Sequence, residues 1–305
     1  MSPSTKKPEP LLDHVVILVP HAFLLSPPPW LAESFTLYPG GQHRDGVTEN
    51  VLVFFADGSY LELIAFVDND TGEKGRPGHR WGAQKEGSVI DWALTLLSDP
   101  TGDDDPTDVP ESTRAEFQEI QRGVKAAGAG GIGYQDLVGG GRNRPDGEVL
   151  KWATSSAEDA AAGKPLEPGV LPFWCLDVTD RLLRVPYREQ ALAKHASGAV
   201  GVAVLQVAPP SSSASDLRPM YDVLFSKVQQ GDDSRAGRWT VETPEPGHHK
   251  GGEVHLVEQG ASSSDGGKKK LSLKLFTTSP GFAGRKIGGP VTDQIRLEFE
   301  FVSAK

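Results

Sequence analysis

The sequence predicts an α+β fold assembled from repeated βαβββ units. Three times along the chain, a short apolar strand is followed by a helical stretch and then by two or three strands separated by glycine turns. Such recurrence is the signature of an internal structural repeat. Two glycine-rich segments, residues 40–46 and 140–147, occupy corresponding places, differ by one inserted residue and both end in Asp-Gly. The repeat is therefore visible in the residues themselves as well as in the order of the elements.

The first unit covers residues 11–67. Its helix is expected to open at Pro29, because proline fits the first turn of a helix. Asp57 and Gly58 are the kind of pair that joins two antiparallel strands in a tight turn. The expected strands are residues 12–19, 35–38, 49–56 and 59–67, and the expected helix is residues 29–35.

The second unit covers residues 88–178 and repeats this order. Ser112 is the expected N-cap of its helix, since a serine side chain accepts from the free N–H groups of a first helical turn. Between the units, the polar, glycine-rich loop 68–87 is either a lid over a site or a surface crossover. The expected helix is residues 111–126, and the expected strands are residues 88–97, 133–138, 148–154 and 170–178.

Residues 188–305 are expected to form a diverged third α+β unit, which keeps the order of elements but lacks the glycine signature. The first two units then pair as one domain over residues 11–187. Linkers are expected where proline, glycine and small polar residues gather, at residues 99–110, 155–169 and 209–215. In the third unit the expected helix is residues 215–229, and the expected strands are residues 201–207, 238–242, 253–258, 271–278 and 294–302.

Composition limits the class of partner. The formal net charge of −10 opposes binding to a phosphate backbone, so no nucleic-acid partner is expected, and the basic run 268–270 is interpreted as a hairpin tip. No apolar stretch is long enough to cross a bilayer, and the N-terminus lacks the pattern of a secretory signal. The single cysteine, Cys175, excludes an internal disulfide. A cytoplasmic protein with no membrane partner is expected.

Two ionisable residues stand in apolar strands of the first unit. Strand alternation puts His14 on one face with Val16 and Leu18, and Glu62 on one face with Tyr60. A carboxylate is costly to bury unless it is paired, hydrogen-bonded or bound to a metal. His14 is the expected partner of Glu62.

The segments 12–17 (LDHVVI), 39–43 (PGGQH) and 57–64 (DGSYLELI) resemble the glyoxalase-like domain of the vicinal oxygen chelate superfamily. The segments 139–147 (GGGRNRPDG) and 171–174 (LPFW) extend the resemblance. It implies that the paired units form a curved, open barrel with a central cleft, with the diverged third unit added to it.

The resemblance also implies a site on the first and last strands of each unit, where a His or Glu and a Glu bind a divalent metal such as Zn, Fe, Mn or Ni. His14 and Glu62 match these positions in the first unit. In the second unit the alignment places Asp91 opposite His14 and Cys175 opposite Glu62. Both side chains are accepted zinc ligands, but a buried thiol beside an aspartate is also an ordinary core arrangement.

Polar side chains of the glycine-rich segments are candidates for binding a substrate at the mouth of the cleft. Arginine offers a planar fork to a carboxylate, although the arginines could instead pair with Asp45 and Asp146 and fix the turns. Neither segment has the spacing of a phosphate-binding loop, so both are expected to be hairpin loops. The candidate substrate-binding residues are His43, Arg44, Tyr60, Arg142, Arg144 and Trp152.

The resemblance implies a lyase- or isomerase-type enzyme acting on a small carbonyl or aromatic compound. A metal would polarise the carbonyl, and Glu62 or Asp91 would move the proton. The alternative is a protein of the same fold that binds or sequesters a small molecule without turnover. An interaction scaffold, in which the third unit pairs two copies as a homodimer, is the remaining hypothesis.

Overall fold

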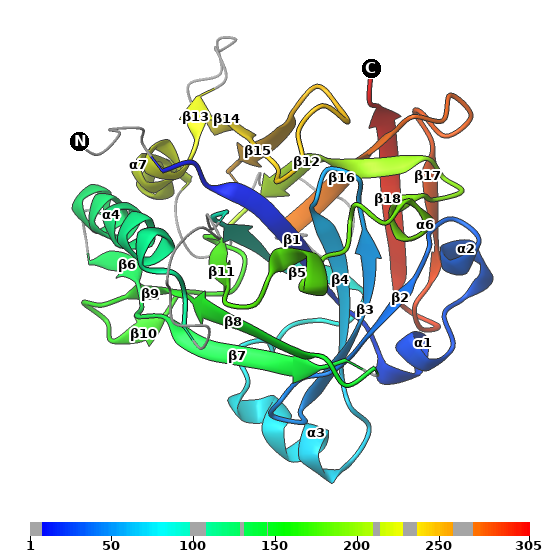
Figure 1. Ribbon diagram of the computed structural model, residues 1–305, viewed down its shortest axis with the longest axis horizontal. Helices are drawn as coiled ribbons and strands as arrows, with labels where there is room; N and C mark the ends of the chain where they lie inside the picture. The colour runs from blue at the N-terminus through cyan, green and yellow to red at the C-terminus, as the bar shows by residue number, and fades with distance from the viewer. Residues whose placement is uncertain are drawn as a thin grey trace.

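The protein, described here from a computed structural model, consists of two large curved β-sheets and one small sheet, with helices at their edges (Figure 1). The structure describes residues 8–97, 108–128, 131–144, 146–209, 214–227, 237–258 and 271–305. The basic run 268–270 and most of two expected linkers lie outside this part of the chain. No helix in the described ranges has the length and apolarity needed to span a membrane.

The first sheet has eight strands in the order β2-β3-β4-β1-β5-β11-β8-β7 and confirms two units of like topology. In each unit the first strand pairs in parallel with the last, as β1 with β4 and β5 with β11. The two first strands, β1 and β5, then pair antiparallel and join the units. The strands are β1 (Leu11–Leu18), β2 (Tyr38–Gln42), β3 (Thr48–Phe54), β4 (Tyr60–Phe66), β5 (Ser88–Thr95), β7 (Val138–Asn143), β8 (Val149–Ser155) and β11 (Phe173–Asp177).

Short helices and a small sheet complete this half of the chain. The helix α4 begins one residue before Ser112, and Pro110 at its N-cap provides no side-chain hydrogen bond, so the N-cap prediction is wrong. The helices are α1 (His21–Leu25), α2 (Pro29–Ala32), α3 (Asp70–Gly75), η1 (Arg76–Gly78), α4 (Glu111–Ala127), α5 (Arg181–Arg184) and α6 (Gln190–Ala193). The small sheet joins β6 (Ile132–Tyr134), β9 (Ala157–Asp159) and β10 (Lys164–Pro165).

The first sheet curls until its two edge strands meet, which makes a nearly closed barrel. An antiparallel bridge joins His43, just after β2, to Arg142 in β7. The backbone N–H of Arg44 also donates to the carbonyl oxygen of Gly141 at 3.3 Å. Closure satisfies edge groups that would otherwise be free to pair with another chain.

The repeated glycines have a steric role inside this barrel. They were expected in hairpin loops, but Gly40 lies in β2 and Gly140 lies in β7. A Cβ on Gly40 would overlap the side chains of Asn50 and Arg142, and a Cβ on Gly140 would lie 2.6 Å from Nε1 of Trp152. The glycines therefore leave room for inward-pointing side chains of the neighbouring strands.

The second sheet has seven strands in the order β13-β14-β15-β12-β16-β18-β17. The third unit is present as β12, α7, β13, β14 and β15, with β12 and β15 parallel. The remaining strands form a shorter unit of the same pairing pattern, in which β16 and β18 are parallel, so one diverged unit becomes two. The elements are β12 (Ala199–Val207), α7 (Ala214–Leu224), β13 (Ser226–Lys227), β14 (Gly237–Val241), β15 (Gly252–Leu256), β16 (Leu271–Thr277), β17 (Lys286–Pro290) and β18 (Arg296–Ser303).

Strand alternation divides the first sheet into two buried faces. Val15 and Leu61 belong to a large apolar core that also contains Leu205 and Leu275 of the second sheet. The helices α4 and α7 lie side by side at one end of the molecule (Figure 1). The opposite face of β1 and β4 turns into the barrel, where His14 and Glu62 point.

Candidate functional site

The barrel encloses a small cavity of about 90 Å³. Its walls are apolar in part, with Trp81, Trp152 and Phe173 among them. Its polar lining residues are His14, His43, Asn50, Tyr60, Glu62, Arg142, Thr154, Cys175 and Arg184. A cavity this size is well below the 300–1,000 Å³ of typical drug-sized pockets, so it suits a small molecule.

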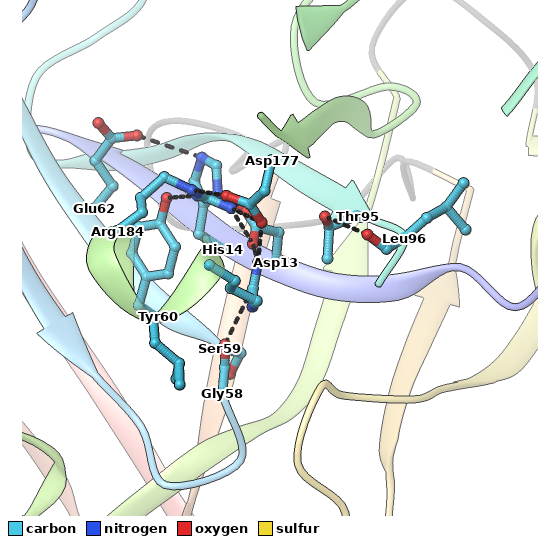
Figure 2. Close-up of polar contacts among 12 residues, drawn as sticks. Asp13, His14, Gly58, Ser59, Tyr60, Glu62, Thr95, Leu96, Asp177 and Arg184 are labelled. Carbon is cyan, nitrogen blue, oxygen red and sulfur yellow. Dashed lines mark hydrogen bonds and ion pairs between the residues drawn. The ribbon is translucent and has the colours of Figure 1, made fainter. Parts of the chain in front are cut away.

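His14 lies between two carboxylates, and Figure 2 shows this cluster. Its Nδ1 is 2.7 Å from Oδ2 of Asp13, and its Nε2 is 3.4 Å from Oε2 of Glu62. Burial by itself lowers the pKa of His14, but the hydrogen bonds to Asp13 and Glu62 outweigh it, so the pKa is raised above its ordinary value. The protonated form of His14 is therefore favoured more strongly than that of an ordinary histidine.

His43 approaches the other oxygen of the same carboxylate. Its Nε2 lies 3.7 Å from Oε1 of Glu62, and its Nδ1 lies 2.7 Å from Oγ1 of Thr48. Burial lowers the pKa of His43, and the nearby charge of Glu62 does not fully offset this. The barrel thus holds one histidine that favours its protonated form and one that favours its neutral form, on either side of Glu62.

Glu62 remains ionised despite its burial. Burial alone would raise its pKa, but the hydrogen bond and charge of His14, with His43 and Asn50, lower the pKa to about 2. Nδ2 of Asn50 donates to Oε1 of Glu62 at 2.6 Å, and Nη1 of Arg142 donates to Oδ1 of Asn50 at 3.0 Å. The Asn50 amide therefore spans the gap between Glu62 and Arg142.

A buried network of ion pairs holds Asp13, the hydrogen-bond partner of His14, and the sequence analysis did not predict this network. Nη1 of Arg184 donates to Oδ2 of Asp13 at 2.9 Å, and Nε of Arg184 donates to Oδ1 of Asp177 at 2.6 Å. Arg181 adds a contact of 2.6 Å to Oδ1 of Asp13. Nη1 of Arg184 also donates to the Tyr60 hydroxyl at 2.8 Å (Figure 2). The sequence feature that could have indicated this network is the pair of arginines on α5, which lie one helical turn apart.

The strand register corrects the placement of Asp91. His14 pairs with Tyr60 on one side and with Ala93 on the other, and Ala93 in turn pairs with Phe173. Ala93 is therefore the counterpart of His14 in the second unit, and it carries no ligand atom. The expected pairing of Asp91 with the His14 position is wrong.

Asp91 has a structural partner for each oxygen. Its Oδ2 accepts from Nη2 of Arg80 at 2.6 Å and from Nε1 of Trp81 at 2.8 Å. Its Oδ1 accepts from the backbone N–H groups of Gly169 and Trp92 at 2.9 and 3.0 Å. Asp91 itself does not line the cavity, but its contacts to Arg80 and Trp81 hold the loop that carries Trp81. Because Trp81 lines the cavity, this part of loop 68–87 covers the site.

Cys175 does lie at the second-unit position that corresponds to Glu62. It follows Phe173 by two residues, as Glu62 follows Tyr60, and it lines the cavity. Burial raises the pKa of the Cys175 thiol well above its ordinary value. The side chain is thus a neutral thiol, and the thiolate is the form that binds metals.

The donor set does not fit a divalent metal of the kind that the family resemblance implies. Of its four strand positions, His14 and Glu62 offer ligands, Ala93 offers none, and Cys175 offers a thiol that would have to lose its proton on binding a metal. Among the described residues no group of three or more His, Cys, Asp or Glu side chains is arranged to hold a metal ion. Catalytic zinc sites typically use three protein ligands.

The remaining candidates separate into two groups. Trp152, Tyr60 and Arg142 line the cavity with His43, whereas Arg44 and Arg144 do not. Arg144 fixes its turn by donating to Asp146 at 2.5 Å and to the carbonyl oxygen of Leu183 at 3.2 Å. The structural alternative considered for these arginines therefore describes Arg144, while Arg142 contacts Asn50 instead of an aspartate.

A larger cavity of about 620 Å³ lies outside the barrel, beside α6 and β12. Among its charged lining residues, Arg188 and Glu245 pair with each other at 3.1 Å. His195, in its wall, accepts from the backbone N–H of Thr36 and lies 2.8 Å from the carbonyl oxygen of Phe54, so both ring nitrogens are used.

Three solved structures that align with this chain are compared here, and the first of them shares its fold. A solved structure of a hypothetical protein from Staphylococcus aureus aligns with a TM-score of 0.60 at 13% identity, covering 96% of this chain and 100% of that chain. Methylmalonyl-CoA epimerase from Mycobacterium tuberculosis aligns with a TM-score of 0.30 at 13% identity, covering 57% of this chain and 91% of its own. The halotolerant catechol dioxygenase BphC gives 0.38 at 12% identity, covering 95% and 86%. At such identities the first likeness is one of fold alone.

The match to a family model shows to which family the chain belongs. A search of curated proteins found no match. The family model described as the glyoxalase-like domain matches residues 12–220, which is more than half of the chain and includes the whole first sheet, β12 and part of α7. With its paired βαβββ units closed around the His14 and Glu62 strands, the chain belongs to the glyoxalase-like domain family.

Proposed function

We propose that the protein is an isomerase- or lyase-type enzyme that moves a proton on a small carbonyl compound inside the barrel. The observation that carries this proposal is the pair His14 and His43, whose pKa values shift in opposite directions on the two sides of Glu62. Neighbouring groups whose pKa values are pushed apart by their surroundings are the usual arrangement for an acid and a base.

In the proposed reaction His14 is the acid and His43 is the base. The His14 imidazolium gives its Nε2 proton to the carbonyl oxygen of the substrate, while Nε2 of His43 accepts a proton from the adjacent carbon. The electron pair of the broken C–H bond becomes the C=C bond of an enol, and the reverse transfers return the proton to carbon. Nδ1 of His43 can donate to Oγ1 of Thr48 at 2.7 Å, which leaves a lone pair on Nε2, 3.5 Å from the amide nitrogen of Asn50.

Glu62 has a different part in this scheme from the one first expected. A carboxylate with a pKa of about 2 is a weak base at neutral pH, so it keeps His14 charged instead of carrying the proton itself. The Tyr60 hydroxyl accepts from Arg184 at 2.8 Å, which leaves its own O–H to donate toward the cavity. No step of the scheme passes through a metal.

The proposal predicts exchange of hydrogen on carbon. A panel of short ketones, aldehydes and 2-oxo acids is incubated with the protein in D₂O, and loss of the proton signals next to the carbonyl is followed by NMR. We expect exchange above the protein-free rate for at least one compound. If compounds bind but none exchanges faster than in buffer, the enzyme proposal is wrong and a non-catalytic binding protein takes its place.

A further inference from the structure

We infer that Arg142 binds a carboxylate of the substrate, so that the substrate is a small carboxylic acid whose reacting carbonyl lies next to the carboxylate. The position of the reacting carbon rests on the proposed function, whereas binding of the carboxylate can be measured without turnover.

Arg142 is a buried cation without a carboxylate. Its residue is only 5% exposed, and its guanidinium lines the cavity. Nη1 donates to the Asn50 amide oxygen at 3.0 Å, but Nε is buried and has no hydrogen-bond partner. No acidic side chain in the described part of the chain forms an ion pair with it. Buried charges are ordinarily paired, so this guanidinium lacks an anion.

The other arginines around the barrel show the contrast. Arg181 and Arg184 each contact both Asp13 and Asp177. Arg144 contacts Asp146. Nε of Arg144 and Nε of Arg181 also lack hydrogen-bond partners, but in each of these guanidinium groups another nitrogen contacts a carboxylate. Among these arginines of the described barrel, Arg142 is the one without a carboxylate in contact, so it is the one placed to take an anion from a substrate.

The chemical class of the anion is inferred from the shape of the guanidinium and from the size and charge of the cavity. A guanidinium presents parallel N–H groups that match the two oxygens of a carboxylate. The cavity of about 90 Å³ also contains the Glu62 carboxylate, which disfavours an anion of higher charge such as phosphate.

The distance between Arg142 and the histidines sets where the reacting carbon lies. The side-chain amide of Asn50 alone bridges Arg142 to Glu62, with contacts of 3.0 and 2.6 Å. Glu62 in turn touches both histidines. A molecule whose carboxylate sits on Arg142 therefore brings the adjacent carbon to His14 and His43, as in a 2-oxo acid.

Calorimetry tests this with pyruvate and with pyruvamide, its uncharged match, on the full chain at neutral pH. We expect pyruvate to bind at least about tenfold more tightly than pyruvamide. Arg142→Gln should remove this preference, and Arg144→Gln should keep it, because Arg144 does not line the cavity. Thermal melts show whether each variant is folded; if Arg142→Gln is not, the two probes on the unchanged protein decide.

The outcomes separate this inference from the proposed function. Equal affinity for the two probes, an unchanged preference in folded Arg142→Gln, or tighter binding of inorganic phosphate overturns the role of Arg142. Tight, Arg142-dependent binding of pyruvate without hydrogen exchange supports the carboxylate site and removes the enzyme proposal instead. If instead an uncharged ketone exchanges hydrogen at a rate that Arg142→Gln does not change, the enzyme proposal is supported and the carboxylate site at Arg142 is removed.

Discussion

Replacing Arg184 with methionine is expected to lower the free energy of unfolding by about 3–5 kcal/mol. Methionine keeps much of the volume of the arginine stem, so the loss comes from the charge. Arg184 is 4% exposed and contacts both Asp13 and Asp177, whose carboxylates would lose a principal partner. Breaking a buried ion pair on one side leaves an uncompensated charge, which is more costly than removing both partners.

Urea denaturation measures this effect, and Arg188→Met is the matched control. Arg188 forms a comparable contact with Glu245, at 3.1 Å, but its side chain is 64% exposed. We expect the control to unfold at nearly the same urea concentration as the unchanged protein, because exposed ion pairs contribute little. Equal losses in the two variants would show that the Arg184 network has no special role.

Replacing His14 with glutamine is expected to slow hydrogen exchange on carbon by about 10²–10⁴-fold, the usual contribution of a positioned acid or base. Glutamine can still donate to a carboxylate but cannot supply a proton near neutral pH. His255→Gln is the matched control, since His255 also pairs with a carboxylate, Glu253 at 2.6 Å, but lies in the second sheet. Retention of full exchange by folded His14→Gln would remove His14 from the mechanism.

The same scheme fixes the pH dependence of exchange in the unchanged protein. The rate should fall as pH rises through the raised pKa of His14, because the acid is lost. It should also fall as pH drops through the lowered pKa of His43, because the base becomes protonated. Since Glu62 contributes to raising the pKa of His14, Glu62→Gln should move the alkaline limb to lower pH.

Much of the fold could be predicted because its signals are local. The strand expected at residues 59–67 is observed as β4, Tyr60–Phe66, and the helix expected at residues 111–126 is α4, Glu111–Ala127. Alternation and glycine turns act within a few residues of chain. The strand β17, Lys286–Pro290, was missed because its two glycines and terminal proline are typical of a turn.

The site was harder to predict because it depends on register and on distant pairs. Counting from the start of each first strand gives Asp91 the place of His14, but the register between β1 and β5 shifts twice and Ala93 takes that place. A bulge re-aims side chains in a way that a sequence does not reveal. Arg184 lies 171 residues from Asp13, so their contact depends on the closed barrel.

The proposed mechanism requires that the barrel cavity hold His14 charged and His43 neutral at the same pH. Its most direct test is a pH titration of the histidine ring nitrogens by ¹⁵N NMR, with His14→Gln and a His43→Gln variant to assign the signals. We predict that His14 titrates above, and His43 below, the ordinary histidine pKa of about 6.5. Coincident titrations, or the reverse order, would contradict the account.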